Sequence, residues 1–353
     1  MKRTGTPSWK RSLIEFTKLA LGLAASALAW GAAAEGRYPI VDSRTLTDGS
    51  SPQFVWIDNE ELLFVSAAPI PEARRSREEF SYAISRWNTR SGAVARVRAF
   101  GHDRPSLCLH DGMFVYGRRA RDGTLEAYHG KLGESEQRVD PRRYAPLFCR
   151  PRAEVPALPK WTQGREIRWL EKLGAGFVDF GEELQPPENT PVRLYRHGMA
   201  QEEGIQLPFG RRSIGKRFPY YEFQRAFFVA SHYYQTPRPR EVAYPVFWLY
   251  EDGRVEKIAA IPWGPWRQSS LSAYPTRAGL VLASGSSARD ETDLADAGLY
   301  LLSAGRVEKL LKGWIAGLTV AVSPDGCRIA FSHAPVVTEK KNVLQAMRLC
   351  AGR

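Results

Sequence analysis

Apolar and polar residues alternate with a period of two in short segments along much of this chain. The clearest example is the stretch 318–333, LTVAVSPDGCRIAFSH, in which two alternating segments flank Ser323-Pro324-Asp325-Gly326. Proline fixes φ, aspartate can bond the backbone ahead of it, and glycine accepts the left-handed conformation, so this tetrapeptide predicts a tight turn. The stretch as a whole therefore predicts a β-hairpin.

Segments similar to the second arm of this hairpin recur along the chain. They end near Ser66, Gly117, Phe180, Ser231, Ser284 and Ser332, at intervals of 48 to 63 residues. In each unit a strand and a tight turn precede the segment, and a third strand, a glycine-containing turn and a more polar fourth strand follow it. The sequence RVEK occupies this fourth strand twice, at 254–257 and 306–309. A period of about 50 residues with several short strands is typical of a propeller blade.

Six such units fit the chain. They predict an all-β fold over residues 35–353, a single domain that is a six-bladed β-propeller of four-stranded antiparallel blades. The last unit has no fourth strand, because its third strand, QAMRLC, leads directly into residues 351–353. The segment 38–46, YPIVDSRTL, has no partner of its own, and we expect it to supply the missing strand and close the ring. A frayed N-terminal tail is the alternative.

The third unit is the least regular. Its approach, residues 149–164, is rich in proline and spans the longest interval between units. Either this approach is an elaborated loop, or the blade boundaries shift at this point.

The SPDG turn and the apolar strand that follows it resemble the blades of TolB-type, WD40-like propellers. The resemblance is good over 318–333 and continues in degenerate form over most of 52–353. It implies an interaction protein of the cell envelope. Such turns specify a fold better than a function, since propellers host enzymes, receptors and scaffolds.

Residues 1–34 have the features of a signal peptide. Basic residues precede the apolar segment LALGLAASALAWGA, and Ala32-Ala33-Ala34 provides small residues for cleavage. A membrane anchor is the alternative, but the apolar segment is shorter than the ~20 residues that a membrane span needs. We therefore expect a periplasmic or secreted protein that does not span a membrane after cleavage. Cleavage lowers the formal net charge from +12 to +8, because it removes five basic residues and one acidic residue.

Four cysteines in an exported chain predict disulfides. Cys327 begins the second strand of the last unit and Cys350 ends its third. Antiparallel pairing places the two side by side, at a separation that a disulfide accepts. Cys108 and Cys149 fall in the first strands of adjacent units, where they either pair with each other or remain buried thiols.

The sequence contains no recognisable catalytic, metal-binding or cofactor motif. The six histidines are scattered without metal-ligand spacing, and there is no nucleophile elbow or phosphate-binding loop. The acidic segment 289–296 departs from the pattern of calcium loops, so a solvated loop is the better interpretation. We expect neither a metal nor a cofactor. Enzyme activity is unsupported, although a catalytic set assembled in space would leave no trace in the sequence.

Basic and aromatic residues recur in the connections between units. In a propeller these connections lie on the same face as the loops between the second and third strands. The candidate ligand-binding residues in them are Arg142, Arg143, Arg211, Arg212, Lys216, Arg217, Trp263, Trp266 and Arg267. Arginine binds carboxylate or phosphate bidentately, and tryptophan offers a stacking surface. The alternative is the ordinary surface charge of a basic protein.

The leading functional hypothesis is an exported binding or interaction module. Its basic, aromatic face would bind an anionic small molecule, a glycan or an envelope protein, and export makes nucleic acid a poor candidate. The alternative is a periplasmic enzyme, a hydrolase or lyase with its site at the mouth of the channel. Clustered His, Asp and Glu side chains with perturbed pKa values would favour the enzyme.

Overall fold

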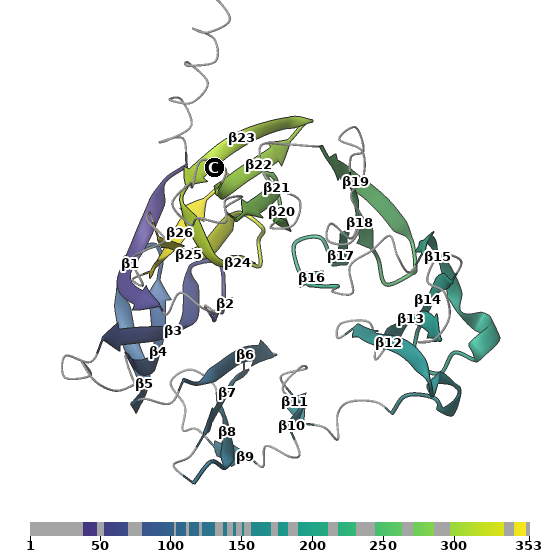
Figure 1. Ribbon diagram of the computed structural model, residues 1–353, viewed down its shortest axis with the longest axis horizontal. Helices are drawn as coiled ribbons and strands as arrows, with labels where there is room; N and C mark the ends of the chain where they lie inside the picture. Colours follow the sequence, from purple (N-terminus) through teal and green to yellow (C-terminus); the bar gives the residue numbers. More distant parts are fainter. Residues whose placement is uncertain are drawn as a thin grey trace, which may run out of the picture.

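Short antiparallel sheets are arranged in a ring in the computed structural model of this protein (Figure 1). The structure describes residues 38–47, 53–69, 80–101, 104–110, 113–119, 122–130, 137–139, 144–145, 150–151, 157–170, 176–182, 190–210, 218–230, 244–262, 271–285, 297–334 and 342–350. Within them, six sheets have four strands each, as the sequence predicts.

Each four-stranded sheet is a blade, numbered here in chain order. Blade 1 contains β2 (Phe54–Trp56), β3 (Glu61–Pro69), β4 (Phe80–Asn88) and β5 (Val94–Gly101). Blade 2 contains β6 (Ser106–His110), β7 (Met113–Arg119), β8 (Leu125–Gly130) and β9 (Gln137–Val139). Blade 3 contains β12 (Arg165–Leu170), β13 (Gly176–Glu182), β14 (Pro191–Tyr195) and β15 (Ile205–Gly210).

The second half of the ring is built in the same way. Blade 4 contains β16 (Tyr220–Tyr221), β17 (Ala226–Ala230), β18 (Tyr244–Leu249) and β19 (Val255–Ile261). Blade 5 contains β20 (Leu271–Thr276), β21 (Gly279–Ser284), β22 (Gly298–Ser303) and β23 (Arg306–Lys312). Blade 6 contains β24 (Trp314–Val322), β25 (Arg328–Ala334) and β26 (Asn342–Arg348), with β1 (Ile40–Thr47) as its outer strand.

The hydrophobic core lies between the blades. Side chains alternate between the two faces of a strand, so a strand between two neighbouring blades presents apolar residues to both. In β21, Leu280 and Leu282 pack with residues of blade 4, whereas Val281 and Ala283 pack with residues of blade 6. This burial on both faces explains why the second strand of each unit reads as a nearly continuous apolar segment.

The N-terminal strand closes the ring, which confirms the prediction made from the missing fourth strand. In blade 6, β1 pairs antiparallel with β26, the last strand of the chain, with Ile40 opposite Met347 and Thr47 opposite Asn342. The buried hydroxyl Oγ1 of Thr47 lies 2.5 Å from Oγ of Ser332. The first described segment is thus held to the last by the ladder with β26, and to β25 by a buried hydrogen bond.

The approach to blade 3 is an elaboration rather than a shift of the blades around it. A separate ladder of β10 (Tyr144–Ala145) and β11 (Arg150–Pro151), and a short 3-10 helix at Lys160–Thr162, precede β12. The predicted place of Cys149 in the first strand of this blade is therefore wrong, because that strand begins only at Arg165. Cys149 itself and the side chain of Cys108 lie outside the described residues, so their pairing stays a prediction.

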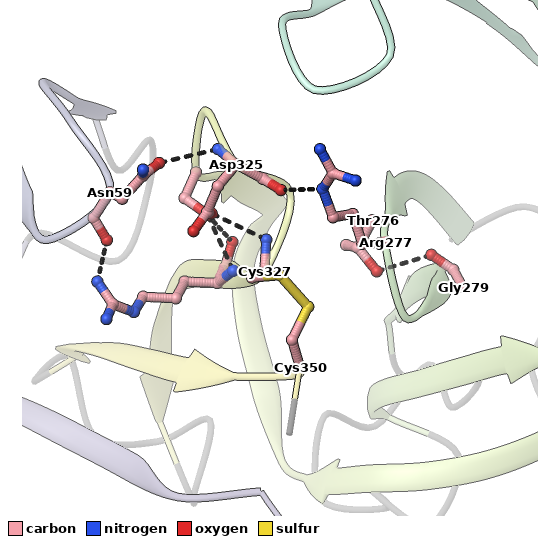
Figure 2. The surroundings of a disulfide bond; sticks show 9 residues. Asn59, Thr276, Arg277, Gly279, Asp325, Cys327 and Cys350 are labelled. Atoms are coloured by element: carbon pink, nitrogen blue, oxygen red, sulfur yellow. Dashed lines mark hydrogen bonds between the residues drawn. A yellow bond between two sulfur atoms is a disulfide. The ribbon is translucent and has the colours of Figure 1, made fainter. Parts of the chain in front are cut away.

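The predicted bond between Cys327 and Cys350 is present, with a Cα–Cα distance of 5.1 Å (Figure 2). The backbone N–H of Leu349 donates to the carbonyl of Cys327 at 2.8 Å, so the ladder between β25 and β26 continues up to the disulfide. The bond therefore ties the end of β26 to the turn that begins the neighbouring strand.

Replacing both cysteines, Cys327→Ser with Cys350→Ser, is expected to lower the free energy of unfolding by about 3 kcal/mol, because the open chain gains conformational entropy in the unfolded state. Urea unfolding of the two proteins without reductant measures this loss. Peptide mapping without reduction is the independent check, and a Cys327 found free, or joined to Cys108 or Cys149, contradicts the bond.

Candidate functional site

The nine candidate ligand-binding residues all lie outside the described residues. The strands on either side nevertheless place their segments in the chain. Residues 211–217 follow β15 and precede β16, and residues 263–270 follow β19 and precede β20. Both segments therefore join the fourth strand of one blade to the first strand of the next, as the sequence predicts. Residues 142 and 143 come directly before β10, in the approach to blade 3.

The connection from blade 5 to blade 6 is the best described part of this face. It carries Lys312, which is exposed, and Trp314, which is half-buried. Beneath it, Nε2 of His333 lies 3.1 Å from the carbonyl of Lys312, and burial lowers the pKa of this histidine. Because a carbonyl only accepts, the neutral ring donates from Nε2. A Cβ on Gly313 would lie 2.4 Å from the same nitrogen, so glycine and histidine together fix the path of this connection.

Blade 3 contains a buried ion pair. The guanidinium of Arg165, at the start of β12, donates to Asp179 in β13, with Nη2 2.6 Å from Oδ2 and Nε 3.1 Å from Oδ1. Asp179 is 1% exposed and also accepts from the backbone N–H of Gly181 at 2.8 Å. The hydrogen bond to Asp179 raises the pKa of Arg165. With its carboxylate fully bonded, this pair holds the two inner strands together.

The opposite face is formed by the hairpin turns, and the SPDG turn contacts two of its neighbours there (Figure 2). Asp325 Oδ1 accepts from Ser323 Oγ and from the N–H of Cys327, which explains the turn locally. Toward blade 1, the N–H of Asp325 donates to Asn59 Oδ1 at 2.9 Å. Toward blade 5, Arg277 donates from its backbone N–H to Gly326 and from Nε to the carbonyl of Asp325, at 2.9 and 2.7 Å.

Arg277 also connects this turn to blade 4. Its guanidinium carbon lies 5.8 Å from the centre of the ring of Phe223, a cation–π distance. A Cβ on Gly326 would lie 2.7 Å from the same ring, so only glycine allows the SPDG turn to approach Phe223 this closely. The inner turns of blades 1, 4, 5 and 6 thus form one contact network around Asp325 and Arg277.

A groove of about 610 Å³ opens on this face between blades 4 and 5. Blade 4 contributes aromatic and aliphatic side chains, and blade 5 contributes two turns of small residues around Arg277. The residues that line it include Phe223, Trp248, Ile258, Arg277, Ala304 and Gly305. Ile258 is 37% exposed, which places it among the few large apolar residues of the described part of the chain that are more than a third exposed.

Sequence reasoning placed the candidate site on the face of the long connections and missed this groove. A signal was present, because Ile258 follows the first RVEK segment as Leu310 follows the second. Over the residues that the structure describes, no cluster of three or more His, Cys, Asp or Glu side chains could hold a metal ion. In the same part of the chain, no helix has the length and apolar character needed to cross a membrane.

No protein-family model matches the sequence, and no curated protein matches it significantly. Solved structures do match at low identity. A putative TolB from Agrobacterium tumefaciens is 14% identical, with 89% of this chain and 97% of that one covered and a TM-score of 0.34. TolB from Acinetobacter baumannii is 13% identical, with 88% and 56% covered and a TM-score of 0.25.

Enzymes are among the matches as well. Trypanosoma rangeli sialidase in complex with sialic acid is 10% identical, with a TM-score of 0.38; the match covers 89% of this chain but only 59% of the sialidase. The six four-stranded blades and the strand β1 that closes their ring make the chain a β-propeller, and these matches add only a distant structural similarity to TolB proteins and to a sialidase. Its function has to be argued from its own residues.

Proposed function

We propose that this protein is an exported binding module that binds an anionic partner on the face of the long connections between blades. The partner class is a carboxylated or phosphorylated small molecule, a glycan or an envelope protein. The proposed contacts are Arg211, Arg212, Lys216 and Arg217 in the connection 211–217, and Trp263, Trp266 and Arg267 in the next connection. Arg142 and Arg143 contribute from the approach to blade 3.

The observation that carries this proposal is the topology of the strands. The turns between the first and second and between the third and fourth strands of a blade lie at one end of the sheet, whereas the loop between the second and third strands and the connection to the next blade lie at the other end. The exposed Lys312 and the half-buried Trp314 show the same pairing of a basic with an aromatic residue in the described connection. Arginine offers two parallel donors to a carboxylate or phosphate, and an aromatic ring beside it offers a stacking surface.

Export is supported by the disulfide as well as by the signal-like segment 1–34, which lies outside the described residues. The bond between Cys327 and Cys350 is of the kind that forms and persists in oxidising compartments such as the periplasm. We therefore propose a periplasmic or secreted location.

Reversing Arg211, Arg212, Lys216 and Arg217 to glutamate is expected to abolish retention on immobilised dextran sulfate. The matched control reverses four exposed arginines in hairpin turns of the opposite face, namely Arg90, Arg196, Arg254 and Arg306. Both variants lower the net charge by the same amount, so net charge cannot distinguish them. The control is expected to retain most of its binding. Equal losses of retention in the two variants would show that binding depends on net charge and not on the connection 211–217.

A further inference from the structure

The groove between blades 4 and 5 leaves open a position that is closed at the next junction of the ring. Ile258 in β19 corresponds to Leu310 in β23, since each directly follows RVEK. Leu310 is 3% exposed and belongs to the core cluster between blades 5 and 6. Ile258 faces blade 5 in the same way but remains 37% exposed. Equivalent apolar residues are therefore covered at one junction and uncovered at the other.

The residue that closes the neighbouring junction can be identified from the strand register. Leu302 pairs with Leu280 in blade 5, and Met347 pairs with Ile329 in blade 6; all four face the preceding blade. Two residues beyond Met347 lies Leu349, which is 4% exposed in the same cluster as Leu310. Two residues beyond Leu302 lies Ala304 instead. At the position where blade 6 has the buried side chain of Leu349, blade 5 thus has only the methyl group of Ala304, which lines the groove.

The turns show that the preceding junction, between blades 3 and 4, is packed at the corresponding point. Gly253 and Gly305 directly precede the two RVEK segments. A Cβ on Gly253 would lie 3.0 Å from Ile205 of blade 3, whereas a Cβ on Gly305 would meet no atom within 4 Å. The junction of blades 3 and 4 is therefore packed at this point, and the junction of blades 4 and 5 is not.

The charge of the groove restricts what can occupy it. Among the described residues that line the groove, Arg277 is the only charged one. Its Nε donates to Asp325, and Figure 2 shows the two terminal nitrogens pointing away from that carbonyl. Terminal guanidinium nitrogens presented side by side match a carboxylate. An occupant with an apolar side chain for Ile258 and a carboxylate for Arg277 complements both features.

We propose that this groove binds an extended peptide of a partner protein, with a leucine-like side chain over Ile258 and an aspartate or glutamate within two residues of it against Arg277. The neighbouring junction supports a peptide as the occupant, because there a leucine side chain of the chain itself, that of Leu349, packs in the same cluster as Leu310. This site lies on the face opposite the proposed anion-binding connections and is independent of them.

The test uses an array of blocked heptapeptides with leucine at the centre and every residue type at the flanking positions. The wild-type protein is expected to select peptides with Asp or Glu within two positions of the leucine. Fluorescence polarisation with the best peptide then compares variants. Ala304→Leu places a leucine side chain in the groove, as Leu349 does at the junction of blades 5 and 6. This variant is expected to weaken peptide binding at least tenfold. The matched control, Glu251→Leu, adds the same side chain to the corresponding turn of blade 4 and is expected to leave binding unchanged.

Arg277→Gln is the second variant, because it tests the charge without filling the groove. It is expected to weaken binding of the acidic peptide about tenfold. The variant should then bind this peptide no more tightly than the same peptide with Asn or Gln in place of Asp or Glu. Thermal melts verify that each variant is folded.

Selection of basic or purely apolar peptides, absence of any selection, or binding that Ala304→Leu leaves intact overturns the proposal. A wild-type dimer that Ala304→Leu dissociates also overturns it, since the occupant is then a second copy. Charge reversal at 211–217 is expected to leave peptide binding unchanged. The proposed peptide site and the proposed anion-binding site are therefore tested independently of each other.

Discussion

Removing residues 38–47 is expected to lower the free energy of unfolding by about 4 kcal/mol or more, because every ladder hydrogen bond contributes about 1 kcal/mol net and the strand forms several. The loss includes the buried contact of Thr47 with Ser332 and the hydrogen bond from Gln345 Nε2 to Asp42 Oδ1 at 2.7 Å. It also exposes the edge of β26 to solvent and to pairing with other chains.

Thermal unfolding of proteins that begin at residue 38 and at residue 48 measures this effect, with a fall of about 6 °C expected for the shorter one. A milder pair of variants isolates the buried contact. Thr47→Val removes a hydroxyl that is 1% exposed, whereas Thr45→Val removes one that bonds only the backbone of Ser43 within the bulge. Thr47→Val is expected to lower the free energy of unfolding more than Thr45→Val does. An unchanged thermal midpoint in the protein that begins at residue 48 is incompatible with closure of the ring by β1.

Asp179→Ala is expected to lower the free energy of unfolding by about 3 kcal/mol, because it leaves the Arg165 guanidinium and the Gly181 N–H without their shared acceptor. This expected loss is at the lower end of the range for buried ion pairs, since the Arg165 side chain keeps 22% of its surface exposed. Asp252→Ala, in an exposed turn of blade 4, is the matched control and is expected to have a much smaller effect.

A double variant distinguishes the ion pair from simple loss of packing. Arg165→Met with Asp179→Leu removes both charges and fills the space with apolar atoms, so its loss is expected to be smaller than that of Asp179→Ala alone. Urea unfolding of the wild type, of the single variants Arg165→Met and Asp179→Leu, and of the double variant supplies the four free energies. Strictly additive losses for the two positions would show that the charges do not interact.

The elements that sequence analysis predicted correctly depend on short-range chemistry or on counting strands. The SPDG turn follows from Pro324, Asp325 and Gly326, whose backbone preferences act locally. Ring closure follows from a unit that is one strand short. The disulfide follows from antiparallel register, which places the start of β25 beside the end of β26. None of these inferences requires knowledge of how neighbouring blades pack.

The features that the sequence did not reveal depend on contacts across a blade junction or between strands. The partner of Asp179 lies 14 residues away, in another strand, and nothing in GFVDFG identifies it. The groove lies between Ile258 of blade 4 and the turn of blade 5 that contains Ala304, so it depends on how two blades pack. The start of blade 3 at Arg165 was obscured by a proline-rich approach that contains its own short ladder.

Closure of the ring by β1 also determines when this protein can finish folding. Thr47 and its ladder partner Asn342 are 295 residues apart, so β1 has to wait for β26, which is synthesised much later. Contacts of such long sequence separation form slowly, because the entropy of the intervening chain is lost before the contact is gained. During this wait β1 is an unpaired strand in a nascent chain. Its bulge between Asp42 and Leu46 interrupts the regular edge and limits premature pairing with other chains.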